Sequence, residues 1–188
     1  MAKPKSEEKR NAIMLAATRV IASQGLGAPT ATIAQEAGVA NGTLFTYFET
    51  KSDLLNALYL ELKSEMATAA LDDLPQKGDL RKKMLHIWNA TMSWALANRE
   101  KRRALAQLAV SDEITPATRA EGHKIMASLS DIIESVRANG PMRNASPSFV
   151  MSLMNSISEA TMDFMIHDPA HSTKHCRAGF DALWRAIA

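Results

Sequence analysis

Short polar side chains and a lysine recur at helical spacing between Thr30 and Lys51. Leu44 and Phe48 stand four residues apart, so both can face inward from one helix. The positions that this leaves pointing partly or wholly outward are Asn41, Thr43, Thr46 and Tyr47. Short polar groups at the N-terminal end of an exposed helix suit contact with base edges and phosphates in a DNA major groove.

The elements that must position these side chains are two short helices joined by a tight turn. The inner face of the first helix is predicted to be Ile33, Ala34 and Ala37. Gly38 breaks this periodicity and suits the left-handed position that follows a helix end. Val39 then fills the turn, and residues 42–48 form the second helix.

A further helix is predicted to precede this pair. Ser6 is a suitable N-cap, and Glu7 and Glu8 lie in the first turn, where the helix dipole favours acids. Gly25 ends the helix, and Thr30 is predicted to cap the next one. Three helices in about 45 residues match the size of a minimal three-helix DNA-binding unit.

Composition favours an all-α chain. The 188 residues are 46% hydrophobic, with only eight glycines and seven prolines. The one cysteine, Cys176, cannot form an intramolecular disulfide, which fits a reducing cytoplasm. No apolar run approaches the roughly 20 residues that span a bilayer, so we expect no membrane partner. The charged N-terminus does not resemble a signal peptide.

The charge distribution is a weak pointer to nucleic acid. The net charge is +2, and residues 1–51 hold six basic residues against four acidic ones. Four of the basic residues fall within the first ten positions, namely Lys3, Lys5, Lys9 and Arg10. They form either a basic arm that contacts phosphate or a solvated, frayed terminus.

The rest of the chain reads as six more helices, about nine in all. Thr50 and Asp53 have capping-box spacing before a helix over residues 51–71, and Pro75 and Gly78 break the chain after it. The later helices are expected at residues 79–97, 100–110, 116–138, 148–167 and 168–187, and Ser146-Pro147 is expected to start the fourth of them as a cap followed by proline. The predicted domains are residues 1–50, for DNA binding, and 51–188, for ligand binding and dimerisation.

The last two helices carry more apolar surface than one solvent-facing pair needs. Two such helices from each of two subunits could form a four-helix bundle about a two-fold axis. Small residues that would allow close approach are Ser152, Ser156, Ala160 and Ala178. The alternative is that these faces pack within one subunit.

The N-terminal stretch resembles the DNA-binding domain of the TetR (tetracycline-repressor-like) family of bacterial transcriptional regulators. The resemblance is close over residues 6–55 and extends further only through length and helical content. The residues that carry it are Gly25, Thr30, Ile33, Ala34, Ala37, Gly38, Val39, Gly42, Thr43, Leu44, Phe45, Tyr47, Phe48, Lys51, Leu54 and Leu55.

This resemblance implies roles for individual positions. Thr43 would meet a base edge or a phosphate, Tyr47 would donate its hydroxyl to a phosphate, and Lys51 would meet another phosphate. The predicted DNA-binding set is Thr30, Thr32, Asn41, Gly42, Thr43, Thr46, Tyr47 and Lys51.

Two positions depart from the family pattern. Phe45 replaces a frequent tyrosine, so a phenolic hydrogen bond is missing. Ala40 replaces a frequent capping serine or threonine, so Asn41 either caps the helix or reads adenine. The alternative for Thr43, Thr46 and Tyr47 is a plain solvated helix face.

A ligand pocket is the less defined expectation. It would be lined by Trp88, Met92, Trp94, His123, Met126 and Met154, with Glu159 as a further polar anchor. Flexible methionines suit an adaptable apolar cavity. The same spacing is also that of an ordinary core, and the core interpretation is favoured.

Metal and enzyme chemistry find little support in the sequence. His167, His171 and His175 recur every four residues with Cys176 adjacent, but Asp168-Pro169 interrupts the helical phase between the first two. HExxH and CxxC strings, glycine-rich phosphate loops and GxSxG elbows are absent. We expect no enzyme, no cofactor and no bound metal.

The sequence thus predicts a cytoplasmic, DNA-binding repressor. It would bind a palindromic operator in double-stranded DNA as a homodimer and be released by an unidentified small-molecule effector. The alternative is an α-helical protein- or metal-binding module without specific DNA recognition.

Overall fold

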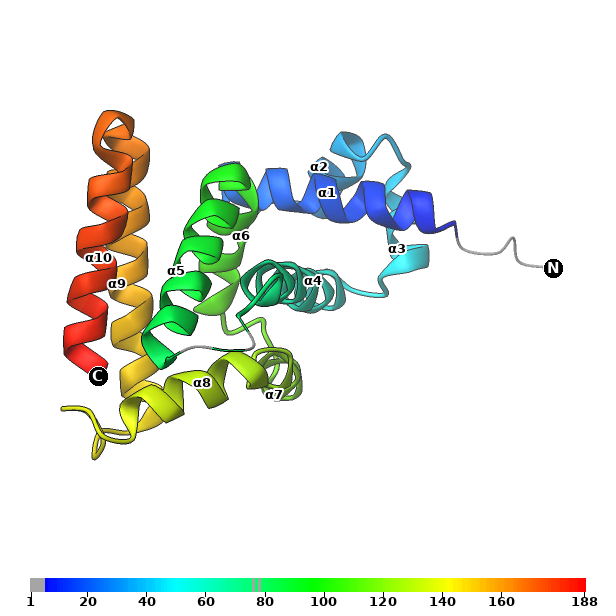
Figure 1. The fold of residues 1–188 in the computed structure, drawn as a ribbon. Helices are drawn as coiled ribbons and strands as arrows, with labels where there is room; N and C mark the ends of the chain where they lie inside the picture. Colours follow the sequence, from blue (N-terminus) through cyan, green and yellow to red (C-terminus); the bar gives the residue numbers. More distant parts are fainter. Residues whose placement is uncertain (1–5, 76, 78) are drawn as a thin grey trace. The chain divides into compact units, whose positions relative to one another are not determined.

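The computed structural model describes residues 6–75, 77 and 79–188, and this part of the chain is all-α, without strands (Figure 1). It contains ten α-helices and one short 3-10 helix, which confirms the predicted fold class. The helices are α1 (Glu7–Gln24), α2 (Thr30–Glu36), α3 (Asn41–Tyr47), α4 (Lys51–Leu71), α5 (Leu80–Ala97), α6 (Arg99–Ala109), α7 (Pro116–Ile125), α8 (Ala127–Arg137), α9 (Pro147–His167), η1 (Pro169–His171) and α10 (Ser172–Ile187).

Several predicted helix ends are confirmed, two of them by side-chain capping hydrogen bonds. Ser6 occupies the N-cap position of α1, although its side chain makes no capping bond. Thr50 and Asp53 form the predicted capping box at α4, with each backbone N–H donating to the other's side chain at 3.0 Å. The Ser146 hydroxyl accepts from the Phe149 N–H at α9.

The prediction of one continuous helix over residues 116–138 is wrong, because the structure divides this segment into α7 and α8. Met126 has φ −91° and ψ 3°, which departs from helical geometry, yet neither glycine nor proline marks the site. The apolar positions stay in register across it, so periodicity gave no signal. This division raises the number of α-helices from the expected nine to ten.

Smaller boundaries also differ from the predictions. Pro29 is the N-cap of α2, and Thr30 is its first helical residue. The second helix of the pair covers Asn41–Tyr47 rather than 42–48. The final helix begins at Ser172 rather than at residue 168, and η1 precedes it, because Pro169 follows Asp168, the C-cap of α9. Gly78, part of the predicted break, lies outside the described residues.

By packing, the chain divides into two compact units. The first comprises residues 1–65 and 98–125, and the second comprises residues 66–97 and 126–188. The predicted boundary at residue 50 is drawn by function rather than by packing, and the two need not coincide. The chain passes from the first unit to the second within α4, after Glu65.

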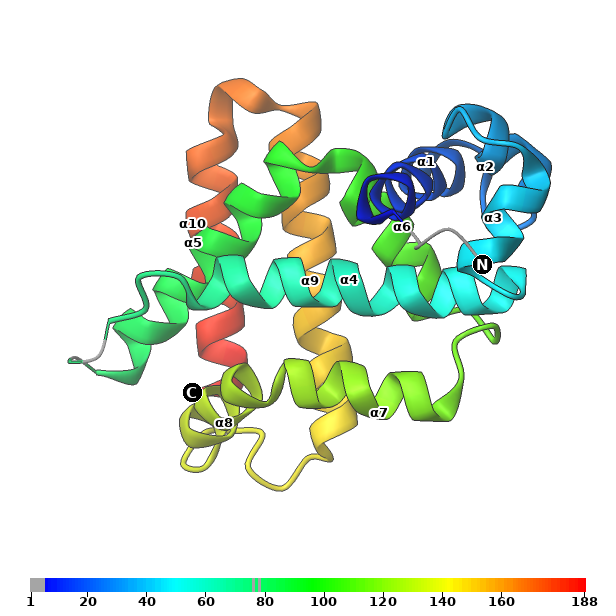
Figure 2. The ribbon, with the colours of Figure 1, turned by 90° about the vertical axis from the view of Figure 1, so that its right-hand side faces the viewer.

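In the first unit, α1 packs on α2 and α6, and α2 packs on α3 (Figures 1 and 2). Side chains with less than 2% exposure line the inner faces of α1 to α4, namely Ile13, Met14, Ile21, Ile33, Leu44, Leu54, Leu55, Leu58 and Leu62. Polar contacts tie α6 to its neighbours. Gln107 Nε2 donates to the Ile21 carbonyl at 3.1 Å, and Lys101 pairs with Glu65 at 2.5 Å.

In the second unit, α9 and α10 lie side by side and antiparallel, and α5 packs on both of them as well as on α8 (Figure 2). Close approach at α10 depends on Gly179, since a Cβ there would meet the Thr161 side chain and the Trp88 ring. The Trp88 indole N–H donates to the Cys176 carbonyl at 3.0 Å. No helix in the described part of the chain is long and apolar enough to cross a membrane.

Candidate nucleic-acid interface

The turn between α2 and α3 is closed by a Schellman motif. The Val39 N–H donates to the Ala34 carbonyl and the Gly38 N–H to the Gln35 carbonyl, both at 3.0 Å. Gly38 has φ +67°, a conformation that a residue with a Cβ rarely adopts. The predicted left-handed glycine is therefore confirmed, and Val39 is half-buried in the turn as expected.

Helix α3 is held by its inner face and leaves its outer face free. Leu44 is fully buried and Phe48, just past the helix end, is 7% exposed. Among the predicted contact residues, Asn41, Gly42 and Thr46 are exposed, whereas Thr43 and Tyr47 are half-buried. Phe45 is 40% exposed, so the departure from tyrosine leaves an apolar ring at the surface.

The N-terminal end of α3 is capped by backbone alone. Ala40 holds the N-cap position, and its carbonyl accepts from the Thr43 N–H at 2.8 Å and the Leu44 N–H at 3.3 Å. Asn41 is already the first helical residue, so it does not take over the capping role. Its exposed amide stays available as a donor and acceptor.

Two hydroxyl groups on α3 differ in what they can still offer. The Thr46 hydroxyl donates to the Gly42 carbonyl at 3.2 Å, so its proton is committed and its oxygen remains an acceptor. The Tyr47 hydroxyl accepts from the Ser6 N–H at 2.9 Å, so its own proton stays free to donate. Tyr47 thereby joins the end of α3 to the start of α1.

Lys51, the first residue of α4, is half-buried, and its ammonium group donates to the Leu26 carbonyl at 2.6 Å. An ammonium carries three N–H groups, so two remain for other acceptors. Thr30 and Thr32, at the start of α2, are half-buried. Sequence patterns could not reveal the contact of Lys51 with Leu26 or of Tyr47 with Ser6, because each joins residues distant in the chain.

The basic residues near this site are partly neutralised by acids. Arg10 pairs with Glu61 at 3.1 Å and lies over the Phe48 ring at 5.9 Å. Arg19 pairs with Glu36 at 3.3 Å. Of the predicted basic arm, Lys9 is exposed on α1, whereas Lys3 and Lys5 lie outside the described residues.

The predicted ligand-pocket residues lie in different surroundings. Trp88, Met92 and Met154 belong to the buried core of the second unit, and Trp94 and Met126 pack at its edge. His123 is exposed on α7, in the first unit. The pocket stays a prediction, and Glu159 is half-buried on α9.

The histidines near the end of α9 are held by a carboxylate. His175 Nε2 lies 2.9 Å from one Asp168 oxygen and His171 Nδ1 3.0 Å from the other. His167 instead bonds the Asp163 carbonyl, and Cys176 donates to Asn89 on α5. Within the described residues, no group of three or more His, Cys, Asp or Glu side chains could hold a metal ion.

Residues 13–58 match the profile of bacterial regulatory proteins of the tetR family. A TetR-family transcription regulator from Shewanella sp. PV-4 is 30% identical and superposes with a TM-score of 0.86 over 96% of this chain and 98% of that one. A second TetR-family regulator, from Marinobacter aquaeolei VT8, has a TM-score of 0.84 and 24% identity, over 97% of this chain and 96% of that one.

The fatty acid metabolism regulator protein of Bacillus subtilis is 34% identical over 73 residues. The matched segment spans only 38% of that relative's length and 38% of this chain. Together with the full-length likeness to the Shewanella protein, these matches place the chain in the TetR family of transcription regulators, which are not enzymes. The helix-turn-helix formed by α2 and α3 is the DNA-binding element of this family.

Proposed function

We propose that the protein is a ligand-responsive repressor that binds a palindromic operator as a homodimer and is released by a small molecule. The observation that carries the proposal is the outer face of α3, whose polar side chains stand on an anchor of Leu44 and Phe48. Residues 1–50 would bind DNA, and residues 51–188 would bind the effector and the second subunit. The protein would act in the cytoplasm without a cofactor.

The proposed DNA contacts follow from the donors that remain free. Tyr47 keeps its hydroxyl proton and Lys51 keeps two ammonium protons, so both can reach phosphate oxygens. Asn41 is the exposed residue best suited to read a base edge, since its amide can bond adenine twice. Thr43 is half-buried beside it and would contact the backbone or a base edge, with Thr30, Thr32, Gly42 and Thr46 at the margin.

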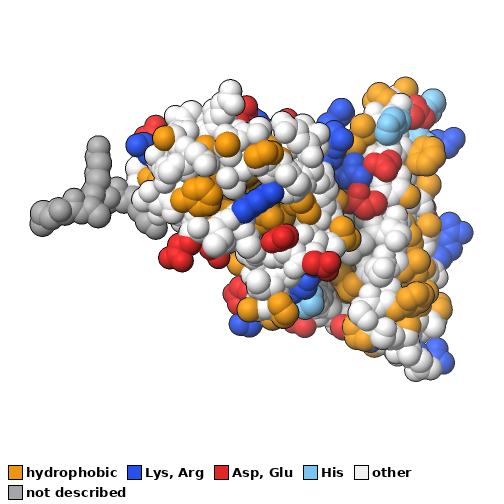
Figure 3. All heavy atoms as spheres, turned by 180° about the vertical axis from the view of Figure 1, so that it is seen from behind, with side chains coloured by type: hydrophobic (Ala, Val, Ile, Leu, Met, Phe, Trp, Pro, Cys, Tyr) orange, Lys and Arg blue, Asp and Glu red, His pale blue; other side chains and the backbone are white. Residues whose placement is uncertain are grey.

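The proposed dimer face lies on α9 and α10. Two large rings on α9 are exposed, Phe149 by 56% and Phe164 by 63%. Between them lie the exposed small residues Ser152, Ser156 and Ala160, and Ala178 is exposed on α10. Figure 3 shows hydrophobic side chains along this helical pair. A stripe of this kind is what a four-helix bundle between two subunits would cover.

The dimer is tested by placing a charge in that stripe. Phe164→Glu would bury two carboxylates in the interface, so analytical ultracentrifugation should show monomers where the unmodified chain shows dimers. Leu85→Glu, at an exposed site on α5, is the matched control and should remain dimeric. Monomers for the unmodified chain would contradict the dimer proposal.

The effector is proposed to be a small organic metabolite. The B. subtilis relative is a fatty acid metabolism regulator protein, which supports a metabolite related to fatty acids as the effector. Adding candidate metabolites to a preformed complex with DNA should lower the fluorescence anisotropy of the DNA if one is the effector.

The DNA-binding proposal is tested on DNA from the promoter of its own gene, with anisotropy measured at several salt concentrations. Thr43→Ala should weaken specific binding. Lys51→Met should reduce the slope of log K against log salt by about one, the value for a single phosphate that is no longer neutralised. Lys124→Met removes an equal charge from a 75% exposed side chain on α7 and should leave that slope unchanged. Equal slopes in both variants would remove Lys51 from the interface.

A further inference from the structure

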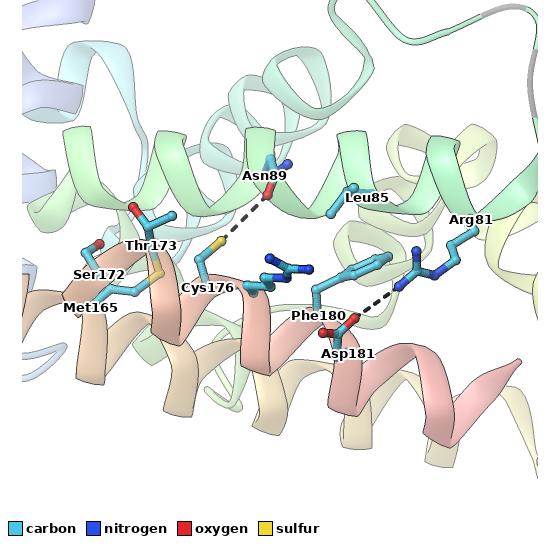
Figure 4. Close-up of a pocket in the computed structure, with 10 residues that line it drawn as sticks. Arg81, Leu85, Asn89, Met165, Ser172, Thr173, Cys176, Phe180 and Asp181 are labelled. Carbon is cyan, nitrogen blue, oxygen red and sulfur yellow. Dashed lines mark hydrogen bonds and ion pairs between the residues drawn. The ribbon is translucent and has the colours of Figure 1, made fainter.

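A hollow of about 440 Å³ lies between α5 and α10, both within the second unit (Figure 4). Its volume falls in the range of roughly 300–1,000 Å³ that is usual for small-molecule sites. None of the residues predicted to form a ligand pocket lines it. The lining residues are Arg81, Leu85, Asn89, Met165, Ser172, Thr173, Cys176, Arg177, Phe180 and Asp181.

The two walls of the hollow are rows of residues spaced by one helical turn. On α5 the row is Arg81, Leu85 and Asn89, and on α10 it is Thr173, Arg177 and Asp181. Contacts between the helices close both ends. Arg81 pairs with Asp181 at 3.0 Å, and the Cys176 thiol donates to the Asn89 side chain across 3.6 Å. This antiparallel register leaves Arg177 in the middle of its row, as Leu85 is in the row opposite.

The floor of the hollow is apolar, and so is the middle of the α5 wall. Phe180 is 2% exposed and Met165 is 6% exposed, so both are fixed by packing. Leu85 is 36% exposed, although it is a large aliphatic side chain. Figure 4 shows Leu85 and Phe180 between the ion pair at one end and Ser172 and Thr173 at the other. An apolar body placed there would remove Leu85 from water.

The charges that line the hollow are unbalanced. Arg81 is satisfied, since it pairs with Asp181 and lies over the rings of Phe180 and Trp184 at 5.5 and 5.9 Å. Arg177 has no hydrogen-bond or ion-pair partner in the part of the chain that the structure describes. The hollow therefore presents one guanidinium without a counter-charge beside an apolar floor.

We propose that this hollow binds a small organic carboxylate with an apolar body. The carboxylate accepts hydrogen bonds from Arg177, with the Thr173 hydroxyl as a further donor. The apolar body lies over Phe180 against Leu85. A role for this ligand as the effector rests on the proposed function, whereas its binding does not require DNA.

Cys176 forms part of the wall rather than a reactive centre. Burial raises the pKa of its thiol above the ordinary value, which disfavours the nucleophilic thiolate. It is nevertheless the only cysteine in the chain, so its slow labelling reports on this hollow alone. A ligand that fills the hollow should shield it.

The test measures the rate at which Ellman's reagent labels Cys176 in the full chain with and without 4-phenylbutyrate. The carboxylate should slow labelling in a saturable manner, and 4-phenylbutan-1-ol, which has the same body without the charge, should protect about tenfold more weakly. Isothermal titration calorimetry should give a matching dissociation constant. Absence of protection by 4-phenylbutyrate, or equal protection by the alcohol, would overturn the proposal.

Matched variants locate the charge contact. Arg177→Gln should weaken 4-phenylbutyrate binding about tenfold, and Arg177→Lys should restore part of it. Lys174→Gln removes an equal charge from an exposed neighbour on α10 that does not line the hollow, and it should bind normally. Equal affinities for Arg177→Gln and Lys174→Gln would contradict the assignment. None of these measurements uses DNA, so they would be unchanged if the protein did not bind an operator. The ligand proposal and the DNA-binding proposal can therefore fail separately.

Discussion

The helix pair α2–α3 and the α5–α10 hollow bring their functional side chains together in opposite ways. In the helix pair, the turn is closed by bonds between residues three and five positions apart, Gln35 with Gly38 and Ala34 with Val39. In the hollow, the ion pair that closes one end joins Arg81 to Asp181, 100 positions apart. The first site is formed by one continuous stretch of sequence, whereas the second forms only because two helices that are distant in the chain pack together. We therefore expect substitutions to lower the free energy of unfolding most at buried side chains and at close helix contacts, and least at an exposed carboxylate.

The anchor of α3 should be the most sensitive point of the helix pair. Leu44→Ala should lower the free energy of unfolding by about 2–5 kcal/mol, since Leu44 is fully buried and its removal leaves a cavity. Phe45→Ala, its 40% exposed neighbour, should cost much less. Urea unfolding followed by circular dichroism measures both, and similar losses would mean that α3 is not anchored through Leu44.

In the second unit, the most sensitive point should be the close contact that α10 makes at Gly179. Gly179→Ala would press a methyl group onto the Thr161 side chain and within 2.9 Å of the Trp88 ring, and Thr161 is held by a 2.7 Å bond to the Ile157 carbonyl. The expected cost is about 1–3 kcal/mol, despite the better helix propensity of alanine.

Gly27→Ala is the control for this substitution, since a Cβ at Gly27 meets nothing within 4 Å. Its urea unfolding midpoint should stay close to that of the unmodified chain. If Gly179→Ala were equally neutral, α9 and α10 would tolerate a wider separation than the structure has.

Tyr47 links the two properties of the first region, stability and DNA binding. Tyr47→Phe keeps the ring but removes the hydroxyl that accepts from Ser6 and, as proposed, donates to a phosphate. Operator affinity by fluorescence anisotropy should fall about tenfold, with a loss of stability of about 1 kcal/mol. A loss of stability with unchanged affinity would make Tyr47 a purely structural residue.

The smallest effect should come from acid at the connection between α9 and α10. Hydrogen bonds from His175 and then His171 lower the pKa of the Asp168 carboxyl below its ordinary value. The resulting stability is present above the unfolded pKa of about 3.9 and is lost as pH falls through the lower folded value.

Asp168→Asn should therefore flatten the decline of the unfolding midpoint below about pH 4. Asp131→Asn on α8 removes an exposed carboxyl in the same unit and should leave that decline in place. Identical acid profiles for the two variants would show that Asp168 and its histidines do not contribute.

The features that the sequence predicts correctly are those that a single short-range rule decides. The Thr50–Asp53 capping box, the left-handed Gly38 and the Ser146-Pro147 helix start were all predicted, because each depends on residues within a few positions. The division at Met126 was missed, since its apolar register is unbroken. The core placement of Trp88 and Met154 was the favoured expectation, whereas the hollow between α5 and α10 follows from no periodicity in the sequence.

The all-α class, the helix-turn-helix and the side chains on its outer face could be read from the amino-acid sequence alone. These follow from helical spacing, caps and glycine, which act within one or two turns of chain. Only the packed fold shows that Tyr47 accepts a hydrogen bond from Ser6 and that Lys51 donates one to Leu26. It also shows that Arg177 lies beside an apolar floor with no partner among the residues that the structure describes. The reason is physical, since a donor's partner is whichever acceptor packing brings within hydrogen-bond distance, and packing joins residues that sequence spacing does not relate.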